Sequence, residues 1–481
     1  MLRPSLYDTM ERKPIPLKPS EDGRVGIYTC GPTVYDHVHI GNLRTFLFED
    51  LLRRTLSYLG YDVLQVMNVT DVDDKIIAAA REAGVGIDEY TAPYVESFFR
   101  DLDTLHVQRA ERYPRATEHV EEMIRLVERL VERGYAYESD GSIFFRIAED
   151  QDYGKLSRID PEQVRRGERV AADEYDKEDA RDFVLWKAAK EGEPSWDSPW
   201  GPGRPGWPIE CSTMSMEYLG ETFDIHTGGV DNIFPHHENE IAQSESATGE
   251  RFVRHWLHAE HLIVEGEKMS KSLGNQYTLS DLLERGVSPR ALRYLFLSVH
   301  YRQKLNFTFD SLAAAGRALE RVDEMRFRVE SAGESAPAGA TAVPDAVERL
   351  DRDFRAALAD DLNASKALAA LFTFVREVNR AVEEGLAEGD RQRVADALAD
   401  VDRVLGVLDP AEWKEAREET GDTAEVEELV AARERARAEK DWAEADRIRD
   451  ELAERGIVLE DTPSGTRWKR SSSTEARAAV S

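Results

Sequence analysis

Residues 24–69 contain a strand–helix–strand pattern, which limits the chain to a small group of folds. Residues 24–31, RVGIYTCG, are typical of a strand that enters a Gly-Pro turn. The next segment, 43–59, has apolar side chains at helical spacing and stops at Gly60, and residues 61–69, YDVLQVMNV, predict a second strand. This order is that of a doubly wound parallel sheet, so the sequence predicts an α/β fold with a Rossmann-like domain.

The length and composition predict several globular domains. The chain has 481 residues, 41% of them hydrophobic, and single hydrophobic cores rarely exceed about 250–300 residues. The sequence has no run of about 18 apolar residues and no apolar signal core at its N-terminus, so we expect a cytoplasmic protein. Its two cysteines, Cys30 and Cys211, form no disulfide framework and are more consistent with thiolates that bind metal or take part in chemistry.

The charge balance is strongly acidic, with 94 acidic and 63 basic residues and a net charge of −31. Such a balance usually argues against nucleic acid binding, because a phosphate backbone favours a basic surface. Only 14 of the basic residues are lysines, and acidic excess with few lysines resembles proteins of salt-loving organisms. In molar salt the Debye length falls to about 3 Å, so net charge then says little about RNA binding. We expect a halophilic source, and an ordinary acidic surface that favours solubility is the alternative.

The rest of the chain divides into segments of different character. Residues 117–134 are expected to be helical, whereas 155–206 is polar and rich in Gly, Pro and Trp, which indicates an insertion rather than sheet core. Strands and loops are expected at 207–266, and nearly all of the sequence beyond residue 276 has a helical pattern.

The C-terminal part is interrupted by two polar stretches, SAGESAPAGATAVP at 331–344 and EETGDTAE at 418–425. The last 60 residues are predicted to form a separate small unit with one charged helix over 426–455. The GIVLEDTPSGTRWKR segment that follows predicts a short hairpin with a Pro-Ser-Gly turn, and the tail at 471–481 is expected to be disordered.

The first of two short motifs, His39-Ile40-Gly41-Asn42, lies where the first strand leads into the first helix. A helix start presents unpaired backbone N–H groups and a partial positive charge, which suits phosphate. Gly41 permits a ligand to approach the backbone closely. His39 and Asn42 can donate hydrogen bonds to phosphate oxygens as charge develops.

The second motif is EKMSKSLGN, in which Lys268, Ser270 and Lys271 lie among small residues on a loop. Two ammonium groups could neutralise a triphosphate and its leaving pyrophosphate. A solvated loop is the plain alternative, but this chain otherwise avoids lysine. Together the two motifs resemble the HIGH and KMSKS signatures of class I aminoacyl-tRNA synthetases, with Asn42 where many members have histidine.

A set of sulfur, nitrogen and oxygen ligands indicates a metal site. Cys211 lies in GWPIECS, and the FPHHENE segment places His236 and Glu240 four residues apart, on one face of a helix. The candidate ligands are Cys30, Cys211, His236 and Glu240, with His237 and Glu238 as alternatives. Such a mixed set suits zinc, and a buried unliganded cysteine is the plain alternative.

Over nearly its whole length the chain resembles the cysteinyl-tRNA synthetases. The matching stretches are YTCGPTVYD, MNVTDVDDKII, DFVLWKAAKEGEPSWDSPWGPGRPGWPIECS, DIHTGGVDNIFPHHENEIAQ, EKMSKSLGN, DDLNASKAL and KDWAEADRIRDEL. One departure is Pro208, where the family commonly has histidine.

The resemblance implies roles for individual residues. One zinc ion is expected on Cys30, Cys211, His236 and Glu240. ATP with magnesium is expected at His39, Gly41, Asn42, Lys268, Ser270 and Lys271, of which His39, Asn42, Lys268 and Lys271 carry catalysis. Thr70, Trp207 and Asp231 are expected around the amino acid, with a turn, a cap or core packing as their plain alternatives. His37 and His226 are expected to be structural or to line the site. The zinc ion would bind the substrate sulfur and so separate cysteine from serine, which a hydrophobic pocket does poorly.

The resemblance also implies a domain order and an RNA partner. We expect a catalytic domain at 1–275 with an insertion around 115–205, a stem-contact region at 276–330, a helical bundle at 345–415 and an anticodon-binding unit at 425–470. Contacts to the tRNA(Cys) anticodon are expected at Arg437, Trp442, Asp446, Asp461 and Trp468. Surface salt bridges are the alternative for Arg437 and Asp446. The implied function is activation of L-cysteine by ATP and transfer to the 3′ adenosine of tRNA(Cys).

Two other functions are compatible with parts of this pattern. A related ligase would use the same catalytic half and give the cysteine to an amino sugar, but such relatives lack a C-terminal unit like 426–470. A non-catalytic zinc- and RNA-binding regulator would be expected to have lost the HIGN or KMSKS residues, and this chain retains both.

Overall fold

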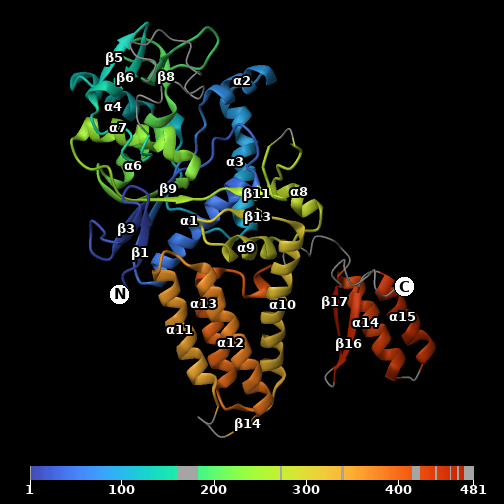
Figure 1. Ribbon diagram of the computed structural model, residues 1–481. Coiled ribbons are helices and arrows are strands. Elements are labelled where there is room, and N and C mark those ends of the chain that lie inside the picture. Colours follow the sequence, from blue (N-terminus) through green and yellow to red (C-terminus); the bar gives the residue numbers. More distant parts are fainter. Residues whose placement is uncertain are drawn as a thin grey trace. The chain divides into compact units, whose positions relative to one another are not determined.

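Figure 1 shows a computed structural model that describes residues 2–159, 182–270, 273–336, 341–413, 423–438, 441–454, 457–462 and 465–470. The chain forms two compact units, Met1–Asp409 and Pro410–Ser481.

A parallel sheet lies at the centre of the first unit (Figure 1). Its described strands are β3 (Arg24–Thr29), β4 (Asp62–Met67), β9 (Phe223–Gly229) and β10 (Val253–Ala259), in the order β10-β9-β3-β4. Helix α1 (Ile40–Tyr58) connects β3 to β4. The predicted strand–helix–strand unit and α/β fold are therefore confirmed.

The order of the strands creates a switch point between β3 and β9. The chain runs from β3 outward to β4, and later returns to the other side of β3 as β9, followed by β10. Connections from β3 and β9 thus leave the carboxyl edge of the sheet in opposite directions. In open α/β sheets this is where ligands bind.

Smaller sheets and helices surround the parallel sheet. The strands are β1 (Ser5–Asp8) with β2 (Lys13–Pro16), and β5 (Ala136–Ser139), β6 (Ser142–Phe145), β7 (Phe183–Ala188) and β8 (Gly203–Pro205) in one antiparallel sheet. The helices are α2 (Asp74–Ala83), α3 (Ile87–Thr104), α4 (Val120–Glu132), α6 (Trp207–Leu219) and α7 (Glu238–Thr248). Strands β7 and β8 fall in the predicted insertion and do not join the parallel sheet. The helix predicted at 117–134 is confirmed as α4.

The C-terminal half of the first unit is mainly helical. Its helices are α8 (Leu279–Glu284), α9 (Pro289–Ser298), α10 (Phe309–Ser331), α11 (Val343–Ala359), α12 (Ala364–Glu384) and α13 (Asp390–Leu405). Short strands are β11 (Leu262–Val264), β12 (Glu267–Lys268) and β13 (Leu305–Phe307) in one sheet, and β14 (Glu334–Ala336) with β15 (Leu386–Ala387). Helices α10 to α13 pack together as a bundle (Figure 1).

The second unit corrects one prediction. Two helices, α14 (Thr423–Ala438) and α15 (Trp442–Glu454), replace the single helix predicted at 426–455. Asp441 starts the second helix, because its carboxylate accepts a hydrogen bond from Glu444 N at 3.1 Å. The break lets the two helices fold back and bury a shared core of Val426, Val430, Ile448, Leu452 and Ile457. The predicted hairpin is confirmed as β16 (Ile457–Thr462) paired with β17 (Gly465–Arg470).

The finer domain boundaries at 1–275, 276–330, 345–415 and 425–470 stay predictions. The tail at 471–481 lies outside the described residues. Among the helices in the described ranges, none combines the length and the apolar character needed to cross a membrane.

A buried ion pair holds α1 in place. The Asp50 carboxylate lies 2.6 Å from Arg293 of α9 and 2.8 Å from Arg54, and both Asp50 and Arg293 have fully buried side chains. Burial alone would raise the pKa of Asp50, but the two guanidinium groups outweigh it and lower the pKa. Arg293 also donates to the carbonyls of Leu405 and Leu105 at 2.8 and 2.9 Å. The pair thus ties α1, whose first residues carry the HIGN motif, to the helical half.

Glu49, also on α1, is a buried carboxyl group behind the carboxyl edge of the sheet. Its Oε1 accepts a hydrogen bond from the Thr227 hydroxyl at 2.8 Å, whereas Oε2 has no hydrogen-bond partner within the described part of the chain. Burial raises the pKa of Glu49 to about 8. The folded protein therefore keeps a proton that the unfolded chain releases near the ordinary glutamate pKa.

We predict that Glu49 makes the protein less stable as pH rises from about 5 to about 8, because the folded state binds more protons over this range. Glu49→Gln keeps the shape and cannot ionise. The measurement is the free energy of unfolding in urea at pH 5 and at pH 8. Between these two pH values it should fall in the variant by at least about 1 kcal/mol less than it falls in wild type, since one pKa unit corresponds to about 1.4 kcal/mol. The control is Glu250→Gln, at an exposed carboxylate, which should behave as wild type. Equal losses in wild type and Glu49→Gln would show that Glu49 is charged in the fold.

Candidate active site

A cleft of about 310 Å³ lies at the carboxyl edge of the parallel sheet. It is lined by residues that follow β3, by the start of α1, by residues after β9 and by the end of β10. Its walls include Cys30, Gly31, Thr33, His37, His39, Gly41, Asn42, Trp207, Asp231, Glu260 and Met269. Both nucleotide motifs and one cysteine therefore share one cavity at the switch point.

His39 caps helix α1. Its Nδ1 accepts hydrogen bonds from the backbone nitrogens of Gly41 and Asn42, both at 3.2 Å, while Asn42 Oδ1 accepts one from His39 N at 3.1 Å. The expectation that these backbone N–H groups are unpaired is therefore wrong, because the His39 ring occupies them. Since Nδ1 accepts, a neutral ring carries its proton on Nε2 and can donate to a ligand there. The Asn42 amide likewise keeps its NH₂ group as a donor.

The second motif approaches the first through Met269. A Cβ placed on Gly41 would lie 2.5 Å from Met269 Cε and 3.0 Å from the His39 ring. Any side chain at position 41 would have to displace Met269. In addition, Ile40 N donates to Tyr277 O at 2.9 Å, which joins the start of α1 to the segment after the loop. The two motifs, far apart in sequence, thus meet at the cleft.

The loop of the second motif is closed by Asn275. Its Oδ1 accepts a hydrogen bond from Ser270 N at 2.9 Å, and its Nδ2 donates to Lys268 O at 3.3 Å. Lys268 ends β12 and is exposed. Lys271, the other predicted lysine, lies outside the described residues.

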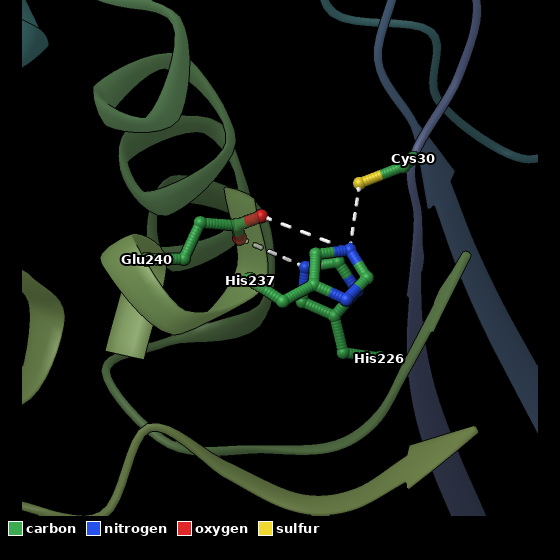
Figure 2. Close-up of side chains that lie close together, drawn as sticks. All are labelled: Cys30, His226, His237 and Glu240. Carbon is green, nitrogen blue, oxygen red and sulfur yellow. Dashed lines mark hydrogen bonds and ion pairs between the residues drawn. The ribbon is translucent and has the colours of Figure 1, made fainter. Parts of the chain in front are cut away.

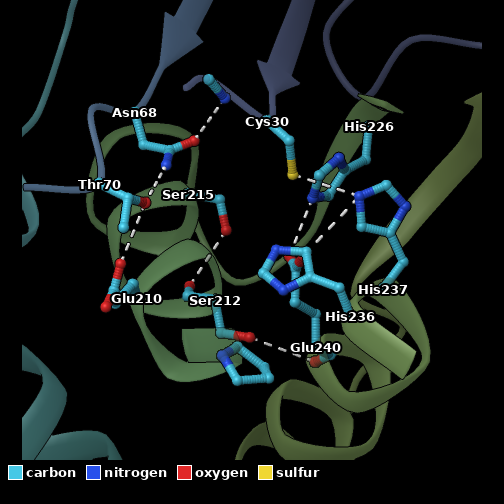
Figure 3. A network of polar contacts seen from close by, with 12 residues as sticks. Cys30, Asn68, Thr70, Glu210, Ser212, Ser215, His226, His236, His237 and Glu240 are labelled. Carbon is cyan, nitrogen blue, oxygen red and sulfur yellow. Dashed lines mark hydrogen bonds and ion pairs between the residues drawn. The ribbon is translucent and has the colours of Figure 1, made fainter. Parts of the chain in front are cut away.

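Four ligand-type atoms from separate elements converge beside the cleft. Cys30 follows β3, and Cys211 lies on α6. His236 lies in the short π-helical segment η5 (Ile233–His237), and Glu240 lies in the first turn of α7. Their ligand atoms all lie within 4.8 Å of one another. Figure 3 shows Cys30, His236 and Glu240 facing the same point. The structure therefore brings together all four predicted ligands.

A second, overlapping group consists of Cys30, His226, His237 and Glu240 (Figure 2). Cys30 Sγ lies 3.2 Å from His237 Nε2, and His226 Nε2 lies 2.9 Å from Glu240 Oε2. His237 Nδ1 is in turn 2.8 Å from His258 Nε2. His237 thus belongs to the cluster, as the sequence allowed. Glu238, the other alternative, does not, because its carboxylate accepts hydrogen bonds from the backbone at 154, 156 and 157.

The cluster favours a thiolate at Cys211 and a neutral imidazole at His237, and it shifts His236 toward its protonated form. Burial raises the pKa of the Cys30 thiol, whereas the hydrogen bond from Cys30 lowers the pKa of Cys211 to about 6. Burial alone would lower the pKa of His236, but Cys211 and Glu240 outweigh it and raise the pKa. Burial and the neighbouring imidazoles hold the pKa of His237 well below its usual range. The buried site therefore already stabilises a sulfur anion at Cys211.

The donor atoms fit a zinc ion. Two thiols, one imidazole and one carboxylate supply the sulfur, nitrogen and oxygen ligands that zinc takes in tetrahedral sites. His236 Nδ1 and Glu240 Oε1 are buried and lack a hydrogen-bond partner among the described residues, although Glu240 Oε1 lies 3.1 Å from His236 Nε2. Buried polar atoms without partners are rare in native proteins. Their lone pairs are consistent with a bound cation.

The three residues predicted around the amino acid take different positions. Trp207 and Asp231 line the cleft, and the Trp207 ring is stacked on His236 with centroids 4.0 Å apart. Thr70 is only 1% exposed and does not line the cleft. Its hydroxyl accepts a hydrogen bond from Asn68 and donates one to Glu210. The structure thus brings two of the three to the cavity and places Thr70 behind its wall.

Several polar residues of the site were not singled out from the sequence. His258, Glu49, Asn68 and Glu210 are all buried and contact the cluster or its neighbours. His226, expected to be structural or to line the site, directly contacts Glu240. The one available signal concerns Asn68, which lies in the predicted strand 61–69, where a buried polar group needs a partner. Glu49 lies in the predicted helix 43–59, and its burial gave no such signal.

The residues predicted to contact an anticodon lie in the second unit. Arg437 lies near the end of α14, Trp442 opens α15 and is 60% exposed, and Asp446 lies 3.2 Å from Arg449 in an exposed ion pair. Asp461 and Trp468 belong to β16 and β17. Their side chains lie outside the described part of the structure.

A parallel sheet that carries these two motifs at one edge defines a class I aminoacyl-tRNA synthetase. The chain matches the model of the tRNA synthetases class I (C) catalytic domain over residues 16–317. It also matches a DALR domain at 353–409 and the cysteinyl-tRNA ligase anticodon binding domain at 420–468.

Curated relatives define the family more narrowly. The cysteine–tRNA ligase of Solibacter usitatus is 49% identical over 466 residues, which cover 96% of this chain and 99% of the relative. That of Protochlamydia amoebophila is 48% identical over 474 residues, or 97% of each chain. This chain therefore belongs to the cysteine–tRNA ligase family.

Solved structures support the same fold at low sequence identity. A Mycobacterium tuberculosis methionyl-tRNA synthetase in complex with methionyl-adenylate is similar with a TM-score of 0.58 and 19% identity, covering 80% of this chain and 90% of that one. A LeuRS–tRNA–LeuAMS ternary complex from Agrobacterium radiobacter has a TM-score of 0.58 and 13% identity, covering 83% and 85%.

Proposed function

We propose that this chain attaches L-cysteine to tRNA(Cys) in two ATP-dependent steps and uses a zinc ion to select the amino acid. The supporting observation is the buried cluster of two cysteines, one histidine and one glutamate beside the cleft that holds both nucleotide motifs. Membership of the cysteine–tRNA ligase family agrees with this arrangement. A cytoplasmic location and magnesium bound with the ATP are part of the proposal.

In the first step a carboxylate oxygen of cysteine attacks the α-phosphorus of ATP. The bond to the bridging oxygen breaks, and pyrophosphate leaves with its negative charge. His39 Nε2 and the Asn42 amide donate hydrogen bonds to phosphate oxygens, and Lys268 and Lys271 neutralise the leaving group. No side chain acts as a nucleophile, so catalysis consists of positioning and charge neutralisation.

In the second step a ribose hydroxyl of the terminal adenosine, proposed to be the 2′-OH, attacks the carbonyl carbon of cysteinyl-adenylate. The mixed anhydride breaks, AMP leaves, and the hydroxyl proton passes to the released phosphate. Trp207 and Asp231 are proposed to hold the amino acid in the cleft, with the Asp231 carboxylate facing the substrate ammonium. Arg437, Trp442, Asp446, Asp461 and Trp468 are proposed to contact the anticodon.

Cys30, Cys211, His236 and Glu240 are proposed to hold the zinc ion. When bound there, zinc prefers a thiolate to a neutral hydroxyl ligand and so distinguishes cysteine from serine. A 10⁴-fold preference corresponds to about 5.5 kcal/mol. Cys30 lines the cleft while Cys211 is 1% exposed, so a substrate thiol would approach from the Cys30 side.

We predict that the chain catalyses cysteine-dependent ATP–pyrophosphate exchange and charges tRNA(Cys). Lys268→Ala should lower kcat/KM for exchange at least 100-fold, because it removes a cation proposed to neutralise the leaving pyrophosphate. The control is Lys304→Ala, at an exposed lysine that does not line the cleft, which should stay within threefold of wild type. Exchange without tRNA charging would instead favour a ligase that acts on another amine acceptor, and no exchange at all would favour a regulator.

We also predict about one zinc ion per wild-type chain after dialysis. Cys211→Ser should lose most of that zinc, because it replaces a thiolate ligand by a hydroxyl. Metal analysis of the purified proteins measures this directly. The matched control is Thr213→Val, whose buried hydroxyl has no hydrogen-bond partner in the described residues. Full zinc in Cys211→Ser would contradict the proposed ligand set.

A further inference from the structure

Three hydrogen bonds in series connect Gly31, the residue after Cys30, to Glu210, the residue before Cys211. Gly31 N lies 2.9 Å from Asn68 Oδ1, Asn68 Nδ2 lies 3.0 Å from Thr70 Oγ1, and Thr70 Oγ1 lies 3.2 Å from Glu210 Oε2. Gly31 follows Cys30, and Glu210 precedes Cys211. Figure 3 shows these hydrogen bonds on the side of the cluster away from His226 and His237.

The direction of these hydrogen bonds is fixed from one end. A backbone N–H can only donate, so Gly31 requires the oxygen of the Asn68 amide on its side. The Asn68 NH₂ group must then point to Thr70 and donate to its hydroxyl oxygen. The Thr70 O–H is left to donate to Glu210. Asn68 therefore has one productive orientation, and the chemistry of each link depends on the link before it.

The links are buried and tightly packed. Asn68 is 2% exposed, and Thr70 and Glu210 are each 1% exposed. A Cβ on Gly31 would lie 1.8 Å from the Asn68 carbonyl oxygen, so the two backbones touch with no room for a side chain. Water cannot easily replace a lost hydrogen bond at such a site, and a buried unpaired amide or hydroxyl is costly.

We infer that Asn68 is a positioning residue for the metal cluster. It sets the distance between Cys30 and Cys211, because it binds Gly31 on one side and, through Thr70, Glu210 on the other. This inference rests on the proposed zinc site. Asn68 is not one of the four proposed ligands and does not line the cleft. It holds the loop after β3 against the start of α6, so that both sulfur atoms reach the same point without relying on the ion to draw them together. Thr70 acts as the middle link of this brace.

The test is zinc affinity of the full-length apoprotein, measured by competition with a chromophoric chelator. Asn68→Ala and Thr70→Val should each weaken zinc binding about 10- to 100-fold, the range found when partners of metal ligands are lost. Thr70→Val keeps the shape of threonine and removes the hydroxyl. Thr70→Ser restores the hydroxyl and should bind zinc within threefold of wild type. The cobalt-substituted proteins should show altered thiolate–cobalt absorption in the first two variants only.

The matched control is Ser215→Ala, which removes a buried hydroxyl from the same helix as Cys211; that hydroxyl lies 3.1 Å from Ser212 O and takes no part in the brace. It should leave zinc affinity and the cobalt spectrum unchanged. Wild-type affinity in Asn68→Ala and Thr70→Val would overturn the inference, and so would an equal loss in Ser215→Ala, since that would reflect general loosening of α6. A wild-type chain that binds no zinc would refute the proposed metal site, and the inference with it.

Discussion

Parallel pairing of β3 with β9 is the contact on which the site depends. The register Ile27↔Ile225 to Thr29↔Thr227 continues into Cys30, whose backbone N–H donates to Thr227 O at 3.2 Å. A shift by one residue would turn Cys30 to the opposite face, because strand side chains alternate. The same pairing forms the switch point from which α1 and the segment with His236 and Glu240 depart on opposite sides. The register between β3 and β9 therefore places the nucleotide motifs and the proposed metal ligands beside one another.

The carboxyl edge of the sheet buries many ionisable groups, and their burial costs free energy that other interactions must offset. Glu49, Glu210 and Glu240 are buried carboxyl groups, and four histidines lie among them. Burial of such groups is tolerated only when they are neutral, hydrogen-bonded or bound to a cation. The raised pKa of Glu49 and Glu210 and the lowered pKa of His237 and His258 follow the first route. The hydrogen bonds that link Asn68, Thr70 and Glu210 provide the second form of compensation. The proposed zinc ion would provide the third, a bound cation.

The sequence predicted the residue types of the site better than their surroundings. Cys30, Cys211, His236 and Glu240 could be chosen because their chemistry is unusual in this chain, and because the family resemblance supplied their grouping. Asn68 and His258 could not, since their partners lie 37 and 21 residues away and only the folded sheet brings them together. The cap by His39 was missed because histidine is not among the residue types that usually cap a helix start.

The break between α14 and α15 has a signal in the sequence. Asp441 is followed three residues later by Glu444, a capping pattern inside an otherwise continuous helical stretch. Charge was less informative. The net charge of −31 identifies no partner, and the expectation of a high-salt source stays a prediction. RNA binding by so acidic a chain rests on local arrangement rather than on total charge.

The most direct test of the account is X-ray absorption at the zinc edge, which counts the sulfur atoms around the ion. Two sulfur ligands are expected in the protein alone, from Cys30 and Cys211, and a third should appear when L-cysteine is added but not when L-serine is added. Two sulfurs under all three conditions would mean that the ion does not read the substrate thiol, and the explanation of amino acid choice would fail.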